Sequence, residues 1–159
     1  MVSTVSSAVQ GAISIEVAHL RDLNALRQLE KVCFPQDAWP LLDLIGVLTF
    51  PNVVRLKAVD GARMVGFIAG DIRHSENIAW IATVGVLPEY RRRGIGALLL
   101  EECESKLPYK TIRLCVRNTN QDAIHLYERY GYRGISQWRD YYQDGESALV
   151  MEKRRSPTS

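Results

Sequence analysis

A stretch in the middle of the chain, from Val84 to Leu100, combines an apolar run, a proline-bearing turn, three arginines, a Gly-x-Gly and a helical pattern. Backbone N–H groups at the start of a helix have no partner within the helix, and the helix dipole adds partial positive charge there. Glycine at such a point lets a phosphate come close to the backbone. The stretch therefore predicts an anion-binding loop at Arg91–Ala97 that suits a phosphate ester.

The apolar spacing on either side of this loop alternates between strand and helix periods. Asp60-Gly61 lies between two apolar runs and indicates a hairpin. Asn118-Thr119-Asn120 predicts a helix cap, and Gly131 predicts a left-handed helix stop. The order of elements predicts an α/β domain with a mixed sheet. The predicted strands cover 13–18, 53–59, 64–72, 78–87, 111–117, 132–142 and 147–153, and the predicted helices cover 23–32 (buried through Leu23, Leu26, Leu29 and Val32), 41–48, a segment from Ile95 closed by Pro108, and 121–130.

Composition narrows the class of protein. The 159 residues fit one domain, and a hydrophobic content of 47% is typical of a globular chain. A net charge of only +2 does not indicate a nucleic-acid surface. Three cysteines without paired or metal-site spacing indicate reduced thiols and a cytoplasmic protein, and no apolar run has membrane-spanning length. We expect a single domain at 13–153, flexible tails at 1–12 and 154–159, no metal, and a monomer or weak homodimer.

Three ordered motifs carry a family resemblance. They are Arg91-x-x-Gly94-x-Gly96, then Asn120-x-x-Ala123-x-x-Leu126-Tyr127-x-x-x-Gly131-Tyr132, and finally the segment from Arg139 to Ala148. Together they resemble the GCN5-related N-acetyltransferase (GNAT) superfamily. The last motif, with Cys33-Phe34-Pro35, resembles the ribosomal-protein and N-terminal α-amine (RimI-like) acetyltransferases. The resemblance implies a mixed, mostly antiparallel sheet of about six to seven strands, about four helices and a splayed central strand pair.

The resemblance also implies acetyl-CoA as cosubstrate. Backbone N–H groups from Arg92 to Ala97 would hold its pyrophosphate, and pantetheine would lie along Val84 and Val86. Gly85 has two interpretations: it relieves crowding against a helix, or it marks a bulge that frees an N–H for the thioester carbonyl. We favour the second. The implied cosubstrate-binding residues are Val84, Gly85, Val86, Arg91, Arg92, Arg93, Gly94, Ile95, Gly96, Ala97, Asn120 and Tyr127.

Asn120 and Tyr127 are seven residues apart and therefore share a face of their helix. Taken alone, they would be a cap residue and a core aromatic residue. By resemblance, Asn120 contacts pantetheine and the Tyr127 hydroxyl is the catalytic group that meets the departing sulfur. A thiol has a pKa of about 8.5 and a phenol about 10, so the phenol could protonate the developing thiolate with little mismatch.

The general base is not identified by the motifs. Related ribosomal-protein acetyltransferases have a glutamate where this chain has Cys115, and some archaeal relatives have a histidine where it has Trp80. An acetyl-cysteine intermediate at Cys115 is disfavoured, because the resemblance implies direct transfer. The remaining candidates, each expected to be a solvated surface group more often than a base, are Glu30, Asp37, His74 and Glu76.

The acceptor is the least constrained part of the prediction. An α-amine has a pKa of about 7.7–8.0 and a lysine about 10.4, so an α-amine needs a strong base less. By resemblance, Tyr141 and Tyr142 form part of the wall that holds a peptide N-terminus; taken alone, they are strand and rim residues. We therefore favour a protein N-terminus as acceptor, with no nucleic-acid or membrane partner. The alternatives are a small-molecule amine acetyltransferase and a coenzyme A sensor without turnover.

Overall fold

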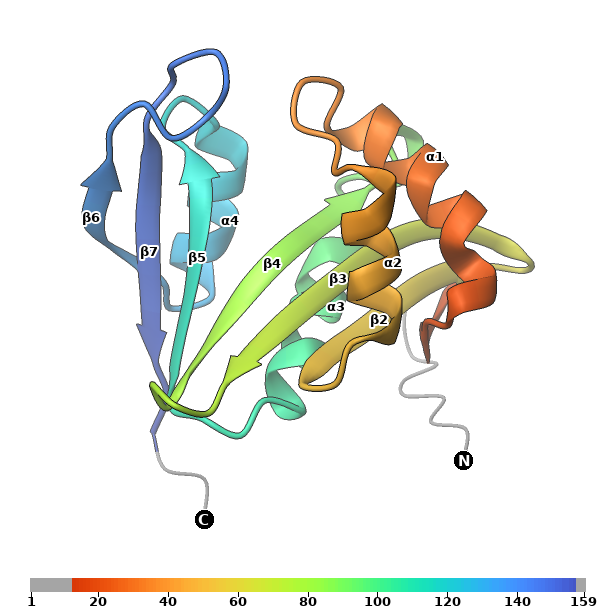
Figure 1. Cartoon of the computed structure of the whole chain (residues 1–159), viewed down its shortest axis with the longest axis horizontal. Helices are drawn as coiled ribbons and strands as arrows, with labels where there is room; N and C mark the ends of the chain where they lie inside the picture. The colour runs from red at the N-terminus through yellow and green to blue at the C-terminus, as the bar shows by residue number, and fades with distance from the viewer. Residues whose placement is uncertain (1–12, 157–159) are drawn as a thin grey trace. The chain divides into compact units, whose positions relative to one another are not determined.

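The computed structural model describes residues 13–156 (Figure 1), so the predicted tails fall largely outside the described part of the chain. The chain divides into two compact units. Unit 1 comprises residues up to 70 together with 83–107, and unit 2 comprises 71–82 together with the residues from 108 onward. The elements, in order, are β1 (Ile13–Val17), α1 (Leu23–Cys33), α2 (Leu41–Thr49), β2 (Val53–Asp60), β3 (Arg63–Arg73), β4 (Ile78–Val86), α3 (Ile95–Ser105), β5 (Thr111–Arg117), α4 (Gln121–Arg129), β6 (Arg133–Trp138) and β7 (Ala148–Arg154), with short 3-10 helices at Leu20–Asp22 and Pro88–Tyr90.

Seven strands follow the order β1-β2-β3-β4-β5-β7-β6. β1 pairs antiparallel with β2, and β7 pairs antiparallel with both β5 and β6. β4 pairs parallel with β5 only from Ile78 to Ile81, although β4 continues to Val86. This mixed, mostly antiparallel sheet with four α-helices confirms the predicted fold class, including the partial pairing of the central strands.

In unit 1, α1 and α2 lie in front of β2 and β3, and α3 lies behind them (Figure 1). Leu26 and Leu29 of α1 are buried, as the helical spacing predicts. The prediction that Val32 is buried is wrong: its side chain is exposed, and Glu30 is buried instead. The helix turns Glu30 inward, where two hydrogen bonds satisfy its carboxylate.

In unit 2, α4 covers one face of β5, β7 and β6 (Figure 1). Ile112, Leu114 and Val116 of β5 are buried, as the alternating pattern predicts. The strand predicted over 132–142 ends earlier, at Trp138, because Asp140 takes a left-handed φ of 52° that a strand cannot continue through.

The end of β7 runs to Arg154, one residue past the predicted end of the domain. The backbone N–H of Arg155 donates to the Lys110 carbonyl at 2.9 Å, so the chain is still held at that residue. Residues 1–12 and 157–159 lie outside the described range. Within that range, no helix is both long and apolar enough to cross a bilayer.

Candidate functional site

In unit 1, the loop before α3 presents a run of backbone N–H groups without backbone acceptors. Arg91 N–H donates to the Pro88 carbonyl and Leu98 N–H donates to the Gly94 carbonyl. Between these two bonds, the N–H groups of Arg92–Ala97 donate to no backbone carbonyl of the described residues. The loop thus offers several adjacent donors at the positive end of a helix, which is the arrangement that holds phosphate groups.

The backbone of this loop is shaped for such a site. Gly94 precedes α3 with a φ of 79°, and a β-carbon there would meet no atom within 4 Å. Arg92 also has a left-handed φ, 64°, which costs a non-glycine residue roughly 1–2 kcal/mol. Strain of this kind concentrates where a backbone geometry serves a ligand. The geometry supports the predicted anion loop at Arg91–Ala97.

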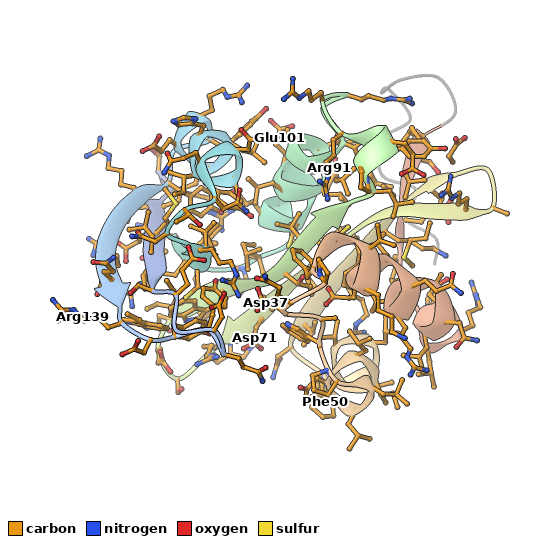
Figure 2. All side chains as sticks on the ribbon, turned by 90° about the horizontal axis from the view of Figure 1, so that it is seen from above. Asp37, Phe50, Asp71, Arg91, Glu101 and Arg139 are labelled. Carbon is orange, nitrogen blue, oxygen red and sulfur yellow. The ribbon has the colours of Figure 1, made fainter. Side chains whose placement is uncertain are left out.

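The three arginines surround the loop with positive charge. Arg91 lies beside the start of α3 (Figure 2), and its Nε donates to the Val86 carbonyl at 2.8 Å. Arg93 donates to the Glu89 carbonyl at 3.4 Å, and its Cζ lies 4.9 Å from the centre of the Tyr90 ring. Arg92 is exposed. These cations would attract a phosphate ester over a distance limited by salt screening.

The end of β4 lies directly against the end of α1. A β-carbon at Gly85 would come within 3.2 Å of Cys33 Sγ and of the Phe34 ring. Cys33 Sγ donates to the Val86 carbonyl at 3.4 Å. The absence of a side chain at Gly85 therefore lets α1 approach the strand, which is the crowding interpretation. The proposed role of Gly85 toward a thioester stays a prediction.

Glu30, one of the four candidate bases, is a buried carboxylate. Its side chain is only 1% exposed. Glu30 Oε1 accepts from Trp39 N–H at 3.3 Å, and Oε2 accepts from the Thr83 hydroxyl at 3.1 Å. Burial raises the pKa of Glu30 above its ordinary value, against a lowering by these two hydrogen bonds. The expectation of a solvated surface group is wrong for Glu30, because only the fold shows which side of α1 it occupies.

In unit 2, Asn120 and Tyr127 both lie on α4. Asn120 Oδ1 accepts from Ala123 N–H at 3.2 Å, so Asn120 caps the helix as its residue type predicts. Tyr127 is 8% exposed and meets the Tyr132 ring edge-to-face at 5.9 Å. Burial raises the pKa of Tyr127 well above that of a free phenol. The predicted close match to a thiol pKa is therefore wrong, although the phenol stays protonated at neutral pH and can donate a hydrogen bond.

Four aromatic rings follow one another on unit 2, from β4 to the loop after β6. Trp80 meets Trp138 at 5.9 Å, Trp138 meets Tyr141 at 5.6 Å, and Tyr141 meets Tyr142 at 5.0 Å. Arg117 Cζ lies 4.3 Å from the centre of the Tyr142 ring. Sequence reasoning selected Tyr141 and Tyr142 but not Trp138, whose place in this row depends on tertiary packing.

Neither Trp80 nor Cys115, which occupy the positions where the resemblance implies a base, offers a readily available base. Trp80 has no basic nitrogen, and its buried Nε1 has no hydrogen-bond partner within the described residues. Cys115 is half-buried, and burial raises the pKa of its thiol, which disfavours the thiolate. His74 is exposed, with Nδ1 2.6 Å from the Tyr109 hydroxyl, and Glu76 is also exposed, whereas Asp37 is half-buried. The described residues contain no cluster of side chains that could hold a metal ion.

Charged side chains hold the loop that follows Tyr142. Glu146 Oε2 accepts from the Thr119 hydroxyl at 2.6 Å and from Thr119 N–H at 2.9 Å, and Oε1 accepts from Arg117 at 2.7 Å. Arg117 also pairs with Asp144 at 2.9 Å. These bonds lower the pKa of Glu146, with Thr119 as the largest cause. The loop is thereby tied to the start of α4.

This network is expected to respond to acid. Because the pKa of Glu146 is lowered in the folded protein, its contacts persist at neutral pH and are lost as pH falls below the ordinary glutamate value of about 4.3. In an NMR titration, the Thr119 amide signal should move only below that value. The same signal should not titrate in Glu146→Gln. A transition at or above the ordinary value would contradict the network.

Comparisons with known proteins found relatives in sequence and in fold. The profile of the acetyltransferase (GNAT) family matches residues 23–132. An N-alpha-acetyltransferase of Saccharolobus solfataricus is 36% identical over 150 residues, covering 86% of this chain and 89% of the relative. An uncharacterized N-acetyltransferase of Methanocaldococcus jannaschii is 32% identical over 142 residues, covering 85% of this chain and 87% of the relative.

Two solved structures share the fold over almost the whole chain. The ribosomal-protein-S18-alanine N-acetyltransferase from Escherichia coli superposes with a TM-score of 0.81 at 26% identity, covering 92% of this chain and 96% of the other. Arabidopsis thaliana Naa50, in complex with the bisubstrate analogue CoA-Ac-MVNAL, superposes with a TM-score of 0.75 at 28% identity, covering 89% and 98%.

Proposed function

Because the chain belongs to the acetyltransferase (GNAT) family, we propose that its acceptor is the N-terminal α-amine of a protein. Membership makes the chain an N-acetyltransferase that takes its acetyl group from acetyl-CoA. The names of its relatives support the acceptor class: one is an N-alpha-acetyltransferase, and another acts on a ribosomal-protein alanine. Acetyl-CoA supplies an activated acyl thioester, and the protein supplies the binding, orientation and proton transfer.

Binding of acetyl-CoA is supported chiefly by one observation. The N–H groups from Arg92 to Ala97 have no backbone acceptors among the described residues. They fit a diphosphate, because each N–H can donate to a phosphate oxygen at the helix start. We propose that Val84, Gly85 and Val86 bind the pantetheine arm. The remaining residues proposed to bind acetyl-CoA are Arg91, Arg92, Arg93, Gly94, Ile95, Gly96, Ala97, Asn120 and Tyr127.

The acceptor side is supported by the aromatic residues of unit 2. Tyr141 is about half exposed, and the loop that follows it is held by Arg117 and Glu146. An ordered loop with exposed aromatic rings offers contact area to a peptide at a low entropic cost. We propose that Tyr141 and Tyr142 contact the first residues of the acceptor, and that the Tyr127 hydroxyl donates a hydrogen bond to the departing thiolate.

A panel of acceptors tests the proposal. The purified protein is incubated with acetyl-CoA and either peptides of varied first residue, N-terminally blocked peptides that carry one lysine, polyamines or amino sugars. Free peptides should be acetylated on the α-amine, as located by mass spectrometry, and blocked peptides should not. Acetylation of the small amines without turnover of any peptide would reject the protein N-terminus as the acceptor.

Location and assembly complete the proposal. Cys33 and Cys115 are free thiols, which suits the reducing cytoplasm. We propose a cytoplasmic monomer or weak homodimer that binds neither nucleic acid nor membrane. Sedimentation of the purified protein over a range of concentrations measures the assembly.

A further inference from the structure

The acetyl-transfer reaction needs an acceptor for the amine proton, and unit 1 contains one buried carboxylate beside the end of β4. Glu30 reaches that strand from α1, where its Oε2 accepts from the Thr83 hydroxyl at 3.1 Å. Thr83 directly precedes Val84–Val86, the stretch proposed for pantetheine. Thr83 is partly exposed and Glu30 is 1% exposed, so Thr83 is the more accessible member of this pair.

The carboxylate of Glu30 accepts two hydrogen bonds but forms no ion pair with a described residue. Trp39 N–H and the Thr83 hydroxyl donate to its two oxygens, and no lysine or arginine of the described residues forms an ion pair with it. Both donors favour the ionised form, whereas burial disfavours it. A buried carboxylate in this situation holds a proton more readily than an exposed one, which is the property that general-base catalysis near neutral pH requires.

The charge of Glu30 also reaches the end of β4. The groups that face this region are the Cys33 thiol on α1 and, after β4, Arg91 and Glu89. The pKa of Cys33 is raised mainly by burial; Arg91 opposes this through a hydrogen bond and its charge, and the charges of Glu30 and Glu89 raise the pKa by smaller amounts. Cys33 itself lies against Gly85 and donates to the Val86 carbonyl. The charge of Glu30 therefore acts at Cys33, beside the end of β4, against the opposite charge of Arg91.

The ionised form of Glu30 is less favourable to folding than the protonated form. Since its pKa is raised in the folded protein, the folded state binds this proton more tightly than the unfolded state does. The ionised side chain therefore costs stability as pH rises above the ordinary range of a glutamate.

We propose that Glu30, acting through the Thr83 hydroxyl, accepts the proton that the acceptor amine loses during acetyl transfer. This inference rests on the proposed reaction but does not depend on which primary amine is the acceptor. Glu30 thereby takes the role for which the chain has neither the glutamate that relatives carry at Cys115 nor the histidine that they carry at Trp80.

The amine nitrogen forms a bond to the thioester carbonyl carbon, and the bond from that carbon to sulfur breaks with its electron pair on sulfur. One N–H proton passes to Thr83 Oγ1 while the Thr83 hydroxyl proton passes to Glu30 Oε2. The thiolate is protonated by its hydrogen-bond donor, which regains its proton from water, and Glu30 releases its proton to water. The net products are one amide and one thiol.

The decisive variant is Glu30→Gln. Glutamine keeps the shape, accepts from Trp39 N–H and can donate to the Thr83 oxygen, but it cannot accept a proton. We expect kcat to fall about tenfold to hundredfold at pH 7.5, while the affinity for acetyl-CoA is unchanged. The melting temperature should rise at pH 7.5, and its difference from wild type should shrink toward acidic pH. A merely structural Glu30 would give near-normal kcat or a lower melting temperature.

Variants of Thr83 provide a second test of the proton route. Thr83→Val removes the hydroxyl at nearly constant volume and should lower kcat by a similar factor, whereas Thr83→Ser should recover most of it. In Glu30→Ala, added formate should restore kcat and its neutral isostere formamide should not. The matched control is Glu104→Gln, the same change at another buried carboxylate of unit 1, which should leave kcat unchanged.

These measurements use whichever amine the acceptor panel finds to be acetylated. If that amine is a polyamine or an amino sugar, the proposed acceptor is wrong and the Glu30 measurement still stands. If Glu30→Gln and Thr83→Val both turn over within about threefold of wild type, the proton route through Glu30 is rejected, whatever the acceptor.

Discussion

Replacing Tyr127 by phenylalanine is expected to lower kcat by about 10²-fold or more, the usual contribution of a positioned proton donor, with little change in acetyl-CoA affinity. The physical reason is the leaving group: a thiolate that departs without a hydrogen-bond donor carries a full charge into a partly buried site. Tyr127 is well packed, and phenylalanine retains its edge-to-face contact with Tyr132, so the fold should persist. Steady-state kinetics and acetyl-CoA titration measure the two effects separately.

Tyr130→Phe provides the matched control, because Tyr130 lies at the end of the same helix and is not assigned to the reaction. Its kcat should equal that of wild type. An unaltered rate in Tyr127→Phe would show that this hydroxyl takes no part in the reaction.

The raised pKa of Tyr127 leads to a separate expectation for the wild-type enzyme. Its rate should show no loss from phenol ionisation up to pH 10, since the buried phenol stays protonated there.

Introducing a carboxylate into the first turn of α3, as Gly96→Glu, is expected to weaken acetyl-CoA binding by about 10²-fold, which corresponds to about 2.7 kcal/mol. The new charge would lie among the N–H groups of Arg92–Ala97 and repel a diphosphate held there. The helix itself should tolerate the change, because glutamate has a higher helix propensity than glycine and is favourable at a helix N-terminus. Calorimetric titration with acetyl-CoA measures the loss.

The neutral isostere Gly96→Gln separates charge from bulk. It should bind acetyl-CoA more tightly than Gly96→Glu, and the difference between the two should narrow at high salt, where charges are screened. Equal affinity of the Glu and Gln variants would show that charge at this turn does not matter. Wild-type affinity in Gly96→Glu would reject the loop as the diphosphate site.

Local features were predictable from the sequence because short-range chemistry determines them. The Asp60-Gly61 hairpin, the Asn120 cap and the left-handed Gly131 each depend on a residue type at one position of the backbone. The loop at Arg91–Ala97 was predictable for the same reason, since glycines and a helix start are sufficient to leave N–H groups without acceptors. Three consecutive motifs at their ordered spacing identified the family.

Long-range features were not predictable, and Val32 and Glu30 show why. Both belong to one helix, and the apolar spacing assigned Val32 to the buried face. The buried position of Glu30 depends on Trp39 N–H and the Thr83 hydroxyl, which lie nine and 53 residues away along the chain. The end of β6 at Trp138 and the contact between Trp80 and Trp138 likewise depend on packing between distant segments.

By itself, therefore, the sequence determined the order of strands and helices, the glycine-containing loop before α3 and the family, because these follow from residue types and spacings along the chain. The tertiary structure alone decided which carboxylates are buried, which thiols have raised pKa values and which aromatic rings meet. Those properties depend on solvent exclusion and on partners brought together by folding, and solvent exclusion is what shifts a pKa. Glu30 illustrates the difference: its residue type makes it an acid, and only its burial beside Thr83 makes it a candidate base.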